Sequence, residues 1–414
     1  MLKRLVLSLA LMLGFGFAPL AANAQEIQQH LQGATPSAEP ALLCLTVDEA
    51  ASLLKLPALD QPEAVAQAAA RLRDVLGAAI VINGEGSDYA DSAQASGWLS
   101  RLPAAGPGPT LADANRVFAD AAAQALARGF VAMEAIIIGA MARNDAESQH
   151  SGDGPLQPRP DFAQHISNLP FFSLPQATTV GGFAALSDAG LGLYAVVDSA
   201  AWVARVVAGG VRTVQLRIKD AEGAEHRDFV REEIRLSIHA ATAAGAQLFI
   251  NDHWQLAIEE GAYGVHLGQE DLHIADLAAI QQAGLRLGIS TNAYWEVCRA
   301  WALQPSYIAC GPIHPTKAKA MPWIPQGNSN LAYWCKLLPT PVVGIAGMDV
   351  ARTEQAAACG ADGVAVISAI TAAASPEEAI VELQQAVQRG RNGPAFQAPL
   401  MPRPTLGPPE QAPR

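Results

Sequence analysis

Polar residues that suit anion chemistry recur at the ends of short apolar runs in the second half of the chain. Residues 214–219, with the sequence V-Q-L-R-I-K, alternate apolar and polar side chains, so in a strand Gln215, Arg217 and Lys219 share one face. Burying two cations is costly unless an anion or a carboxylate compensates them. The pattern therefore predicts an anion-binding strand that points into a barrel, with a structural ion pair or a solvated strand as the alternatives.

Acidic residues follow the next two apolar runs. Asn251 and Asp252 come after Gln247–Ile250, and Asp271 comes shortly after Gly264–Leu267. If these runs are neighbouring parallel strands, the two carboxylates meet at one rim, beside the cationic strand. Such a pair suits an octahedral Mg²⁺ that bridges to a diphosphate. Each aspartate alone has a plainer interpretation as the N-cap of a following helix, but both together favour the metal site.

Two further loops add small polar and basic groups. Ser290 lies among small polar residues directly after Arg286–Ile289. The loop 310–319 is punctuated by Gly and Pro and carries Thr316 and Lys319. A loop of this kind can close over phosphates as a lid, or it can be a solvated surface loop.

The last two apolar runs end in residues that suit backbone recognition of phosphate. Gly347 follows Val342–Ile345, and Ile367 and Ser368 close the final run. Glycine permits close backbone approach, and the loops after the seventh and eighth strands of a barrel commonly bind phosphate with help from a helix N-terminus. We therefore expect a second anion site, opposite the first.

The elements that must position these residues alternate regularly over about 200 residues. The apolar runs, each an expected strand, are Leu193–Val197, Thr213–Ile218, Gln247–Ile250, Gly264–Leu267, Arg286–Ile289, Tyr307–Cys310, Val342–Ile345 and Gly363–Ile367. Helical patterns such as 229–244 and 351–358 fill the intervals. This predicts an α/β protein with a (β/α)₈ TIM barrel over residues 190–390. An open doubly wound sheet is the rival, but no G-x-G-x-x-G supports it.

A small partial α/β unit is expected before the barrel, over residues 41–145. Thr46 is a plausible N-cap, Glu63–Leu76 and Leu111–Ala127 have helical spacing, and Ala78–Ile82 resembles a buried strand. A further helix is expected at Ala132–Ala142. Residues 146–189 are rich in Ser, Gly and Pro and are expected to form a linker, in which the apolar run Leu169–Phe172 can pack against a domain. The Pro-dense residues 391–414 are expected to form a disordered tail.

Taken in order, the barrel motifs resemble those of the thiamine-phosphate synthase family. They are Q-L-R-I-K-D at 215–220, I-N-D at 250–252, G-V-H-L-G-Q-E-D at 264–271, G-I-S at 288–290, P-T-x-x-K at 315–319 and V-I-S-A-I at 366–370. The resemblance implies a Mg²⁺-dependent transferase that joins hydroxymethylpyrimidine diphosphate to a thiazole phosphate and releases pyrophosphate. A related barrel, the thiazole tautomerase, and a non-catalytic binding pseudoenzyme are the competing interpretations.

The resemblance also implies a role for each motif residue. Asp252 and Asp271 would hold Mg²⁺, and Lys219, Arg217, Ser290 and Lys319 would be catalytic. The substrates would be bound by Gln215, Lys219, Asn251, Ser290, Thr316, Lys319, Gly347, Ile367 and Ser368. The chain departs from the family at Ala318, where a Thr is usual, and at Ala346, where a Gly is usual. We expect these changes to raise the KM for the thiazole phosphate while activity is retained.

The unit at 41–145 resembles, more weakly, the back half of hydroxymethylpyrimidine phosphate kinase, which implies a ribokinase-like remnant. Kinases of this type need a loop whose backbone N–H groups bind an anion. The nearest segment here, 106–110, reads G-P-G-P-T, and its prolines remove the donors. We therefore expect this unit to be non-catalytic.

Charge and the N-terminus bound the partners and the compartment. The net charge of −12 argues against binding to nucleic acid or anionic lipid, so small-molecule substrates are the expected partners, and a homo-oligomer is compatible with the sequence. Residues 1–40 begin with a basic pair and an apolar run over 5–20 that resembles a signal peptide and is short for stable membrane insertion. Because the implied substrates are phosphorylated cytosolic metabolites, we expect a cytoplasmic location. The five cysteines are scattered and predict neither a disulfide framework nor a zinc site.

Overall fold

The computed structural model describes residues 42–84, 86–101, 110–150, 155–173, 182–187, 190–219, 224–316 and 322–407. Its contacts divide the chain into two compact units. The first comprises residues 1–177, 293–302 and 406–414, and the second comprises residues 178–292 and 303–405. The signal-like segment within residues 1–40 lies outside the described residues.

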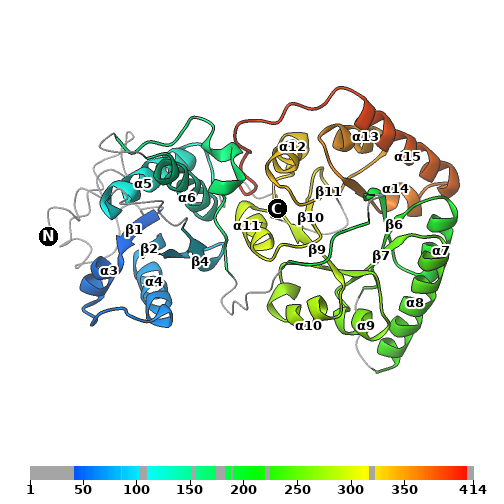
Figure 1. Ribbon diagram of the computed structural model, residues 1–414, viewed down its shortest axis with the longest axis horizontal. Helices are drawn as coiled ribbons and strands as arrows, with labels where there is room; N and C mark the ends of the chain where they lie inside the picture. The colour runs from blue at the N-terminus through cyan, green and yellow to red at the C-terminus, as the bar shows by residue number, and fades with distance from the viewer. Residues whose placement is uncertain are drawn as a thin grey trace. The chain divides into compact units, whose positions relative to one another are not determined.

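Eight parallel strands of the second unit close into a barrel, which confirms the predicted fold class (Figure 1). The strands are β5 (Gly192–Val197), β6 (Thr213–Leu216), β7 (Gln247–Asn251), β8 (Gly264–Leu267), β9 (Arg286–Thr291), β10 (Tyr307–Cys310), β11 (Val342–Ile345) and β12 (Gly363–Val366). Each pairs with its neighbours in chain order, and β12 pairs with β5 to close the ring. Every predicted strand is present, because buried parallel strands read as short apolar runs between turns.

Helices lie between successive strands along the chain and after the last one. They are α7 (Ala200–Ala208), α8 (Ala224–Ala243), α9 (Trp254–Glu259), η3 (Asp271–His273), α10 (Leu277–Gln282), α11 (Tyr294–Ala302), α12 (Gly327–Leu337), α13 (Val350–Ala358), α14 (Ser368–Thr371) and α15 (Pro376–Asn392). Local capping fixes several starts, since the side chains of Ser199, Asp276 and Asp349 accept backbone N–H groups at α7, α10 and α13. The α11 helix groups with the first unit.

Aromatic side chains fill the centre of the barrel. Tyr194, Phe249 and Tyr307 are at most 1% exposed. Phe249 meets Tyr307 edge to face, with ring centroids 5.0 Å apart. Gly288 on β9 makes the room for this packing, since a Cβ there would lie 2.1 Å from the Tyr307 ring. The barrel is therefore a packed core that supports a site at one end, not a pore.

The first unit is a four-stranded sheet covered by helices. Its strands, in sheet order, are β1 (Leu42–Thr46), β2 (Ala79–Asn83), β3 (Ser87–Asp91) and β4 (Ser96–Ser100), with β1 and β2 parallel and the others antiparallel. Its helices include α3 (Val47–Leu54), α4 (Pro62–Leu76), α5 (Leu111–Ala127) and α6 (Ala132–Gln149). Thr46 caps α3 as predicted, in a reciprocal capping box with Glu49. Asp88 on β3 is fully buried and ion-paired with the buried Arg143 of α6, at 2.5 Å.

Part of the predicted linker is ordered on this unit. The α6 helix continues to Gln149, and the short helices η1 (Phe162–Gln164) and η2 (Ile166–Asn168) follow. Phe172 forms an antiparallel bridge with Leu99 of β4 and is fully buried. The burial of Leu169 and Phe172 agrees with the expectation that this apolar run packs against a domain. The two short helices were hidden by the polar composition of the segment.

The tail also differs from the expectation of disorder over residues 391–414. Residues up to 407 follow a defined path, and residues 408–414 lie outside the described part of the chain. The Asn330 side chain exchanges two hydrogen bonds with the backbone of Arg403, and the Ile324 N–H donates to the Thr405 carbonyl at 2.9 Å. Prolines lack an N–H, but several of the backbone groups that remain in this segment bond to the barrel unit.

No helix among the described residues is long and apolar enough to span a bilayer.

Candidate active site

The predicted anion-binding strand contributes one buried amide and two cationic side chains that lie outside the core. Gln215 on β6 is 4% exposed, and its Nε2 donates to the Tyr194 hydroxyl at 3.2 Å. The strand ends at Leu216, so Arg217 and Lys219 lie in the loop beyond it, partly buried and exposed respectively. Gln215 is buried within the barrel as expected, whereas Arg217 and Lys219 belong to the loop at the carboxyl end of the strand. In the loop the two charges keep access to water, which removes the cost of burying them.

The two predicted metal ligands do come together at the carboxyl ends of β7 and β8. Asp252 follows β7 with φ 61°, and its backbone N–H donates to the His266 carbonyl on β8 at 3.0 Å. Asp271 begins η3, and its Oδ2 accepts the Gly268 N–H at 3.0 Å. Burial, the Asp271 charge and a hydrogen bond between the two carboxyl groups raise the pKa of Asp252 to about 7. The nearby Arg217 cation opposes this rise in the pKa of Asp252.

Neither aspartate serves as a helix N-cap. His253 occupies the N-cap of α9 and makes no side-chain capping bond, while Asp276 caps α10. Asn251 instead donates from Nδ2 to Asp252 Oδ2 at 2.5 Å, which orients that carboxyl group. The geometry favours a shared cation site over the capping alternative.

A chain of buried polar side chains leads from β6 across the barrel to β9, and sequence reasoning missed most of it. The hydroxyl groups of Tyr194 and Tyr307 are hydrogen-bonded, with their oxygens 2.7 Å apart. His266 lies between Tyr307 and Ser290, with Nδ1 2.7 Å from the Tyr307 hydroxyl and Nε2 2.7 Å from Ser290 Oγ. Burial, with a smaller contribution from Arg217, lowers the pKa of His266 to about 4, so the ring is neutral near pH 7.

The sequence held one signal for this chain. His266 stands inside the G-V-H-L-G-Q-E-D motif, at the position where a polar residue interrupts an apolar strand. The two tyrosines read as ordinary core aromatics, and only the closed sheet shows that their hydroxyl groups meet.

The predicted second anion site gathers at the carboxyl ends of β10 to β12. Gly347 follows β11 with φ 69°, and a Cβ there would lie 2.7 Å from the His314 Cβ. The loops after β10 and β11 are joined by a hydrogen bond from the His314 N–H to the Ala346 carbonyl at 3.2 Å. Ile367 and Ser368 are exposed at the start of α14, after β12.

The remaining predicted residues of this rim belong to the loop after β10. Thr316 is described and partly buried. Lys319 and Ala318 lie outside the described residues, so the proposed lid stays a prediction.

The acidic pair with its neighbouring cations and the predicted second anion site lie on opposite sides of the ring of strands. Strands β6 to β9 carry the acidic and cationic residues, and β10 to β12 carry the glycine-bearing loops. Because all eight strands are parallel, both groups lie at the same end of the barrel.

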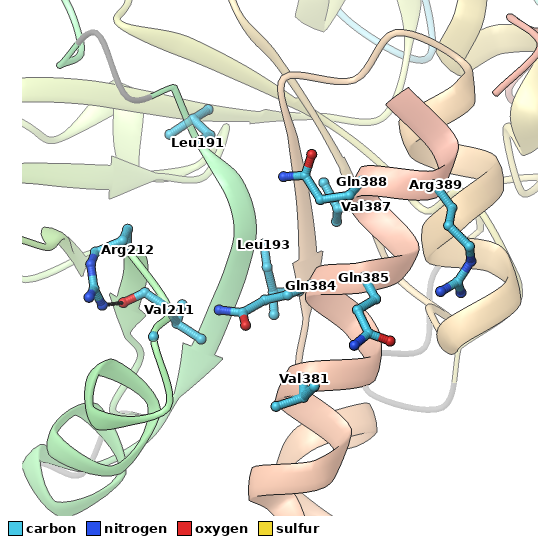
Figure 2. Close-up of a pocket in the computed structure, with 11 residues that line it drawn as sticks. Leu191, Leu193, Val211, Arg212, Val381, Gln384, Gln385, Val387, Gln388 and Arg389 are labelled. Carbon is cyan, nitrogen blue, oxygen red and sulfur yellow. Dashed lines mark hydrogen bonds between the residues drawn. The ribbon is translucent and has the colours of Figure 1, made fainter. Parts of the chain in front are cut away.

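A cleft of about 720 Å³ lies at the other end and is separate from this site. Figure 2 shows Gln384 and Gln388 on the side of α15 that faces β5 and β6, where Leu193 and Arg212 lie. Leu193 and Arg212 stand at the amino ends of β5 and β6, far along the strands from the acidic pair. Its lining contains no carboxylate and supports none of the chemistry above.

A closed ring of parallel strands with polar residues at its carboxyl rim is the arrangement of (β/α)₈ barrel enzymes. The family model described as thiamine monophosphate synthase matches residues 193–370. A thiamine-phosphate synthase of Yersinia pestis is 51% identical over 199 residues, which cover 48% of this chain and 91% of that protein. One of Salmonella paratyphi B is 52% identical over 198 residues, covering 47% and 90%. The chain belongs to the thiamine-phosphate synthase family.

Among solved structures, a thiamine phosphate pyrophosphorylase from Pyrococcus furiosus aligns at 27% identity. The alignment covers 48% of this chain and 96% of that one, with a TM-score of 0.43.

Proposed function

We propose that this protein is a thiamine-phosphate synthase, a transferase that couples hydroxymethylpyrimidine diphosphate with a thiazole phosphate. The observation that carries the proposal is the meeting of Asp252 and Asp271 beside the loop of Arg217 and Lys219. An acidic pair next to two cationic groups suits a diphosphate that arrives with a metal ion. The glycine-bearing loops across the rim suit a second, singly phosphorylated substrate.

We propose Mg²⁺ as the cation at the acidic pair. The Asp271 charge raises the pKa of Asp252, and a divalent cation between the two carboxyl groups would offset that repulsion. The described residues hold no group of three or more His, Cys, Asp or Glu side chains able to ligate a metal. Asp252 and Asp271 would therefore supply two oxygens, and water and the diphosphate would supply the rest, which is the usual habit of Mg²⁺. When bound, Mg²⁺ would offset charge on the departing pyrophosphate.

The residues of the chain then act on the diphosphate by charge and orientation. Arg217 and Lys219 would neutralise its oxygens, and Asn251 would hold the Asp252 carboxyl group in place. The bond that breaks joins the methylene carbon to the diphosphate oxygen, and its electron pair leaves with pyrophosphate. The thiazole nitrogen lone pair forms the new C–N bond. Proton transfer is not required, which agrees with a buried, neutral His266.

The second substrate would be held by its phosphate on the opposite rim. Gly347 brings backbone close to the mouth, and the first N–H groups of α14, beginning at Ser368, have no acceptor within the helix. Holding the phosphate there would aim the thiazole nitrogen across the mouth at the pyrimidine carbon. Fixed placement of two reactants is worth several kcal/mol of barrier, roughly 7–11 in the best cases.

The test is pyrophosphate release by the purified full chain with both substrates, with and without Mg²⁺. We expect release only when all three are present. Asp252→Asn should abolish it, whereas Asp276→Asn, a matched change at the cap of α10, should leave it intact because asparagine also caps helices well. Turnover that persists in a chelator would contradict the metal site. Binding without turnover would favour the non-catalytic alternative, and rearrangement of the thiazole alone would favour the tautomerase.

We further propose that the first unit is a non-catalytic remnant related to hydroxymethylpyrimidine phosphate kinase. The order of a parallel β1–β2 pair followed by two antiparallel strands and the α5–α6 helix pair supports a partial α/β unit. The proline-bearing segment 106–109 lies outside the described residues. Incubation with ATP and hydroxymethylpyrimidine phosphate should give no diphosphate, and its formation would contradict the proposal.

A further inference from the structure

The buried polar chain has a direction that follows from its donors and acceptors. Gln215 Nε2 can only donate, and it donates to the Tyr194 hydroxyl at 3.2 Å. Tyr194 is 1% exposed, so its own hydrogen needs a protein acceptor, and the Tyr307 hydroxyl lies 2.7 Å away. The Tyr307 hydrogen then goes to His266 Nδ1, at 2.7 Å. His266 is left with its hydrogen on Nε2, which donates to Ser290 Oγ at 2.7 Å.

The opposite direction is less favourable. With the Gln215 amide placed as it is, a Tyr307 hydrogen directed at Tyr194 would leave the Tyr194 hydrogen without an acceptor among the bonds of the described residues. A buried donor without a partner costs roughly 1–3 kcal/mol. Reversal would require the Gln215 amide to turn over, so that its oxygen faced Tyr194.

On the basis of the proposed function, we propose that Tyr307 and His266 are positioning residues that set the hydroxyl direction of Ser290. Because His266 donates to Ser290 Oγ, the serine oxygen accepts on that side and its own hydrogen turns away from His266. Ser290 is partly exposed at the carboxyl rim, so that hydrogen is offered to the mouth of the barrel. Its acceptor would be a ring nitrogen of the pyrimidine substrate.

The packing around Tyr307 and His266 indicates that these side chains do more than fill the core. The Tyr307 ring stacks on His266 with centroids 5.7 Å apart and planes inclined by 19°, which fixes the imidazole in its plane. Gly288 gives the ring its place, since any side chain there would overlap it. A connected polar network in a core costs more than an apolar one unless every member is satisfied, so it specifies one arrangement. In this protein the hydrogen-bond network ends at the hydroxyl group of Ser290, at the candidate active site.

The kinetic test replaces the tyrosine hydroxyl group without changing the ring. Tyr307→Phe should lower kcat/KM for the pyrimidine substrate about tenfold, the effect of losing one buried hydrogen bond. Tyr263→Phe is the matched control, because its hydroxyl donates to Gln247 Oε1 at 2.6 Å near the amino end of the same aromatic cluster. We expect it to change kcat/KM less than about twofold.

A double-mutant cycle separates positioning from general damage. If Tyr307 acts through Ser290, Tyr307→Phe should have little further effect once Ser290→Ala is present. Effects that multiply in the double variant would overturn the proposal, since they would mean that Tyr307 supports the fold rather than the hydroxyl group.

A spectroscopic test does not depend on turnover and so stands apart from the proposed function. In ¹⁵N-histidine-labelled protein, the His266 signal, assigned by its loss in His266→Gln, should show a proton on Nε2 and none on Nδ1. Tyr307→Phe should shift this balance toward Nδ1, and Tyr263→Phe should not. A wild-type ring protonated on Nδ1 would overturn the proposal. If His266 carries its proton on Nε2 but the two substrates do not react, the proposed function is wrong and the proposed hydrogen-bond direction holds.

Discussion

Replacing Asp252 with asparagine removes one carboxylate of the acidic pair. It therefore separates the stability that the pair costs the folded protein from the role of the pair in binding a cation. Asparagine tolerates the left-handed φ of 61° and keeps a side-chain oxygen for Asn251, so the loop should hold its shape. The pKa of Asp252 rises from 3.8 to about 7, and a shift of about 3 units corresponds to about 4 kcal/mol. Because Asp252 is only partly buried, solvent screening reduces this to roughly 1–2 kcal/mol.

The raised pKa of Asp252 determines how stability changes with pH. The folded protein holds the Asp252 proton more tightly than the unfolded chain, so the stabilising contribution is full below about pH 3.8 and is lost as the pH rises through 7. Without metal, Asp252→Asn should therefore be more stable than wild type by ~1–2 kcal/mol near pH 8, and the gain should shrink toward pH 5.

The assay is urea unfolding of both proteins in a chelator at the two pH values, repeated with Mg²⁺. Mg²⁺ should stabilise the wild type and not the variant, because only the wild type keeps both carboxylates. Asp276→Asn serves as the control. A variant that is less stable near pH 8, or a difference that does not depend on pH, would refute the reasoning.

Three further predictions address other parts of the site. Ala346 adopts φ 84°, so Ala346→Gly should raise the free energy of unfolding by roughly 0.5–1 kcal/mol in urea titrations and lower the KM for the thiazole phosphate with kcat unchanged; an unchanged KM with an altered kcat would contradict this. Gly288→Ala would place a Cβ 2.1 Å from the Tyr307 ring and should cost roughly 1–3 kcal/mol of stability and most of the activity, and an unaffected melting temperature would speak against the packing described. Because Asp252 must lose its proton to bind a cation and its pKa is about 7, the apparent Mg²⁺ affinity should fall by about fivefold between pH 7 and 6, with proton release seen by calorimetry in buffers of different ionisation enthalpy.

The barrel could be read from the sequence because its strands are buried on both faces and appear as apolar runs between turns. The first unit was harder. Strand β3 has the sequence S-D-Y-A-D, and its buried Asp88 is compensated by Arg143 from a helix about 55 residues later, so no local pattern announces it. At β6, the alternation continues through Ile218, but the strand ends at Leu216, so the two cations belong to the loop rather than to the strand.

The acidic residues of the site were predictable as types, because two of them follow neighbouring strands beside a predicted strand that carries two cations. Their effect on one another was not, since it depends on the left-handed turn at Asp252 and on the register of β7 against β8. The hydrogen bond between Tyr194 and Tyr307 joins residues 113 apart in the sequence, and only closure of the barrel brings them together.

The most direct test of the central claim counts products. With hydroxymethylpyrimidine diphosphate, the thiazole phosphate and Mg²⁺, the purified chain should form thiamine phosphate and pyrophosphate in equal amounts, and neither should appear when one substrate is omitted. Pyrophosphate that accumulates without thiamine phosphate, or no product from wild-type protein that binds both substrates, would contradict the joining of two substrates across the barrel mouth.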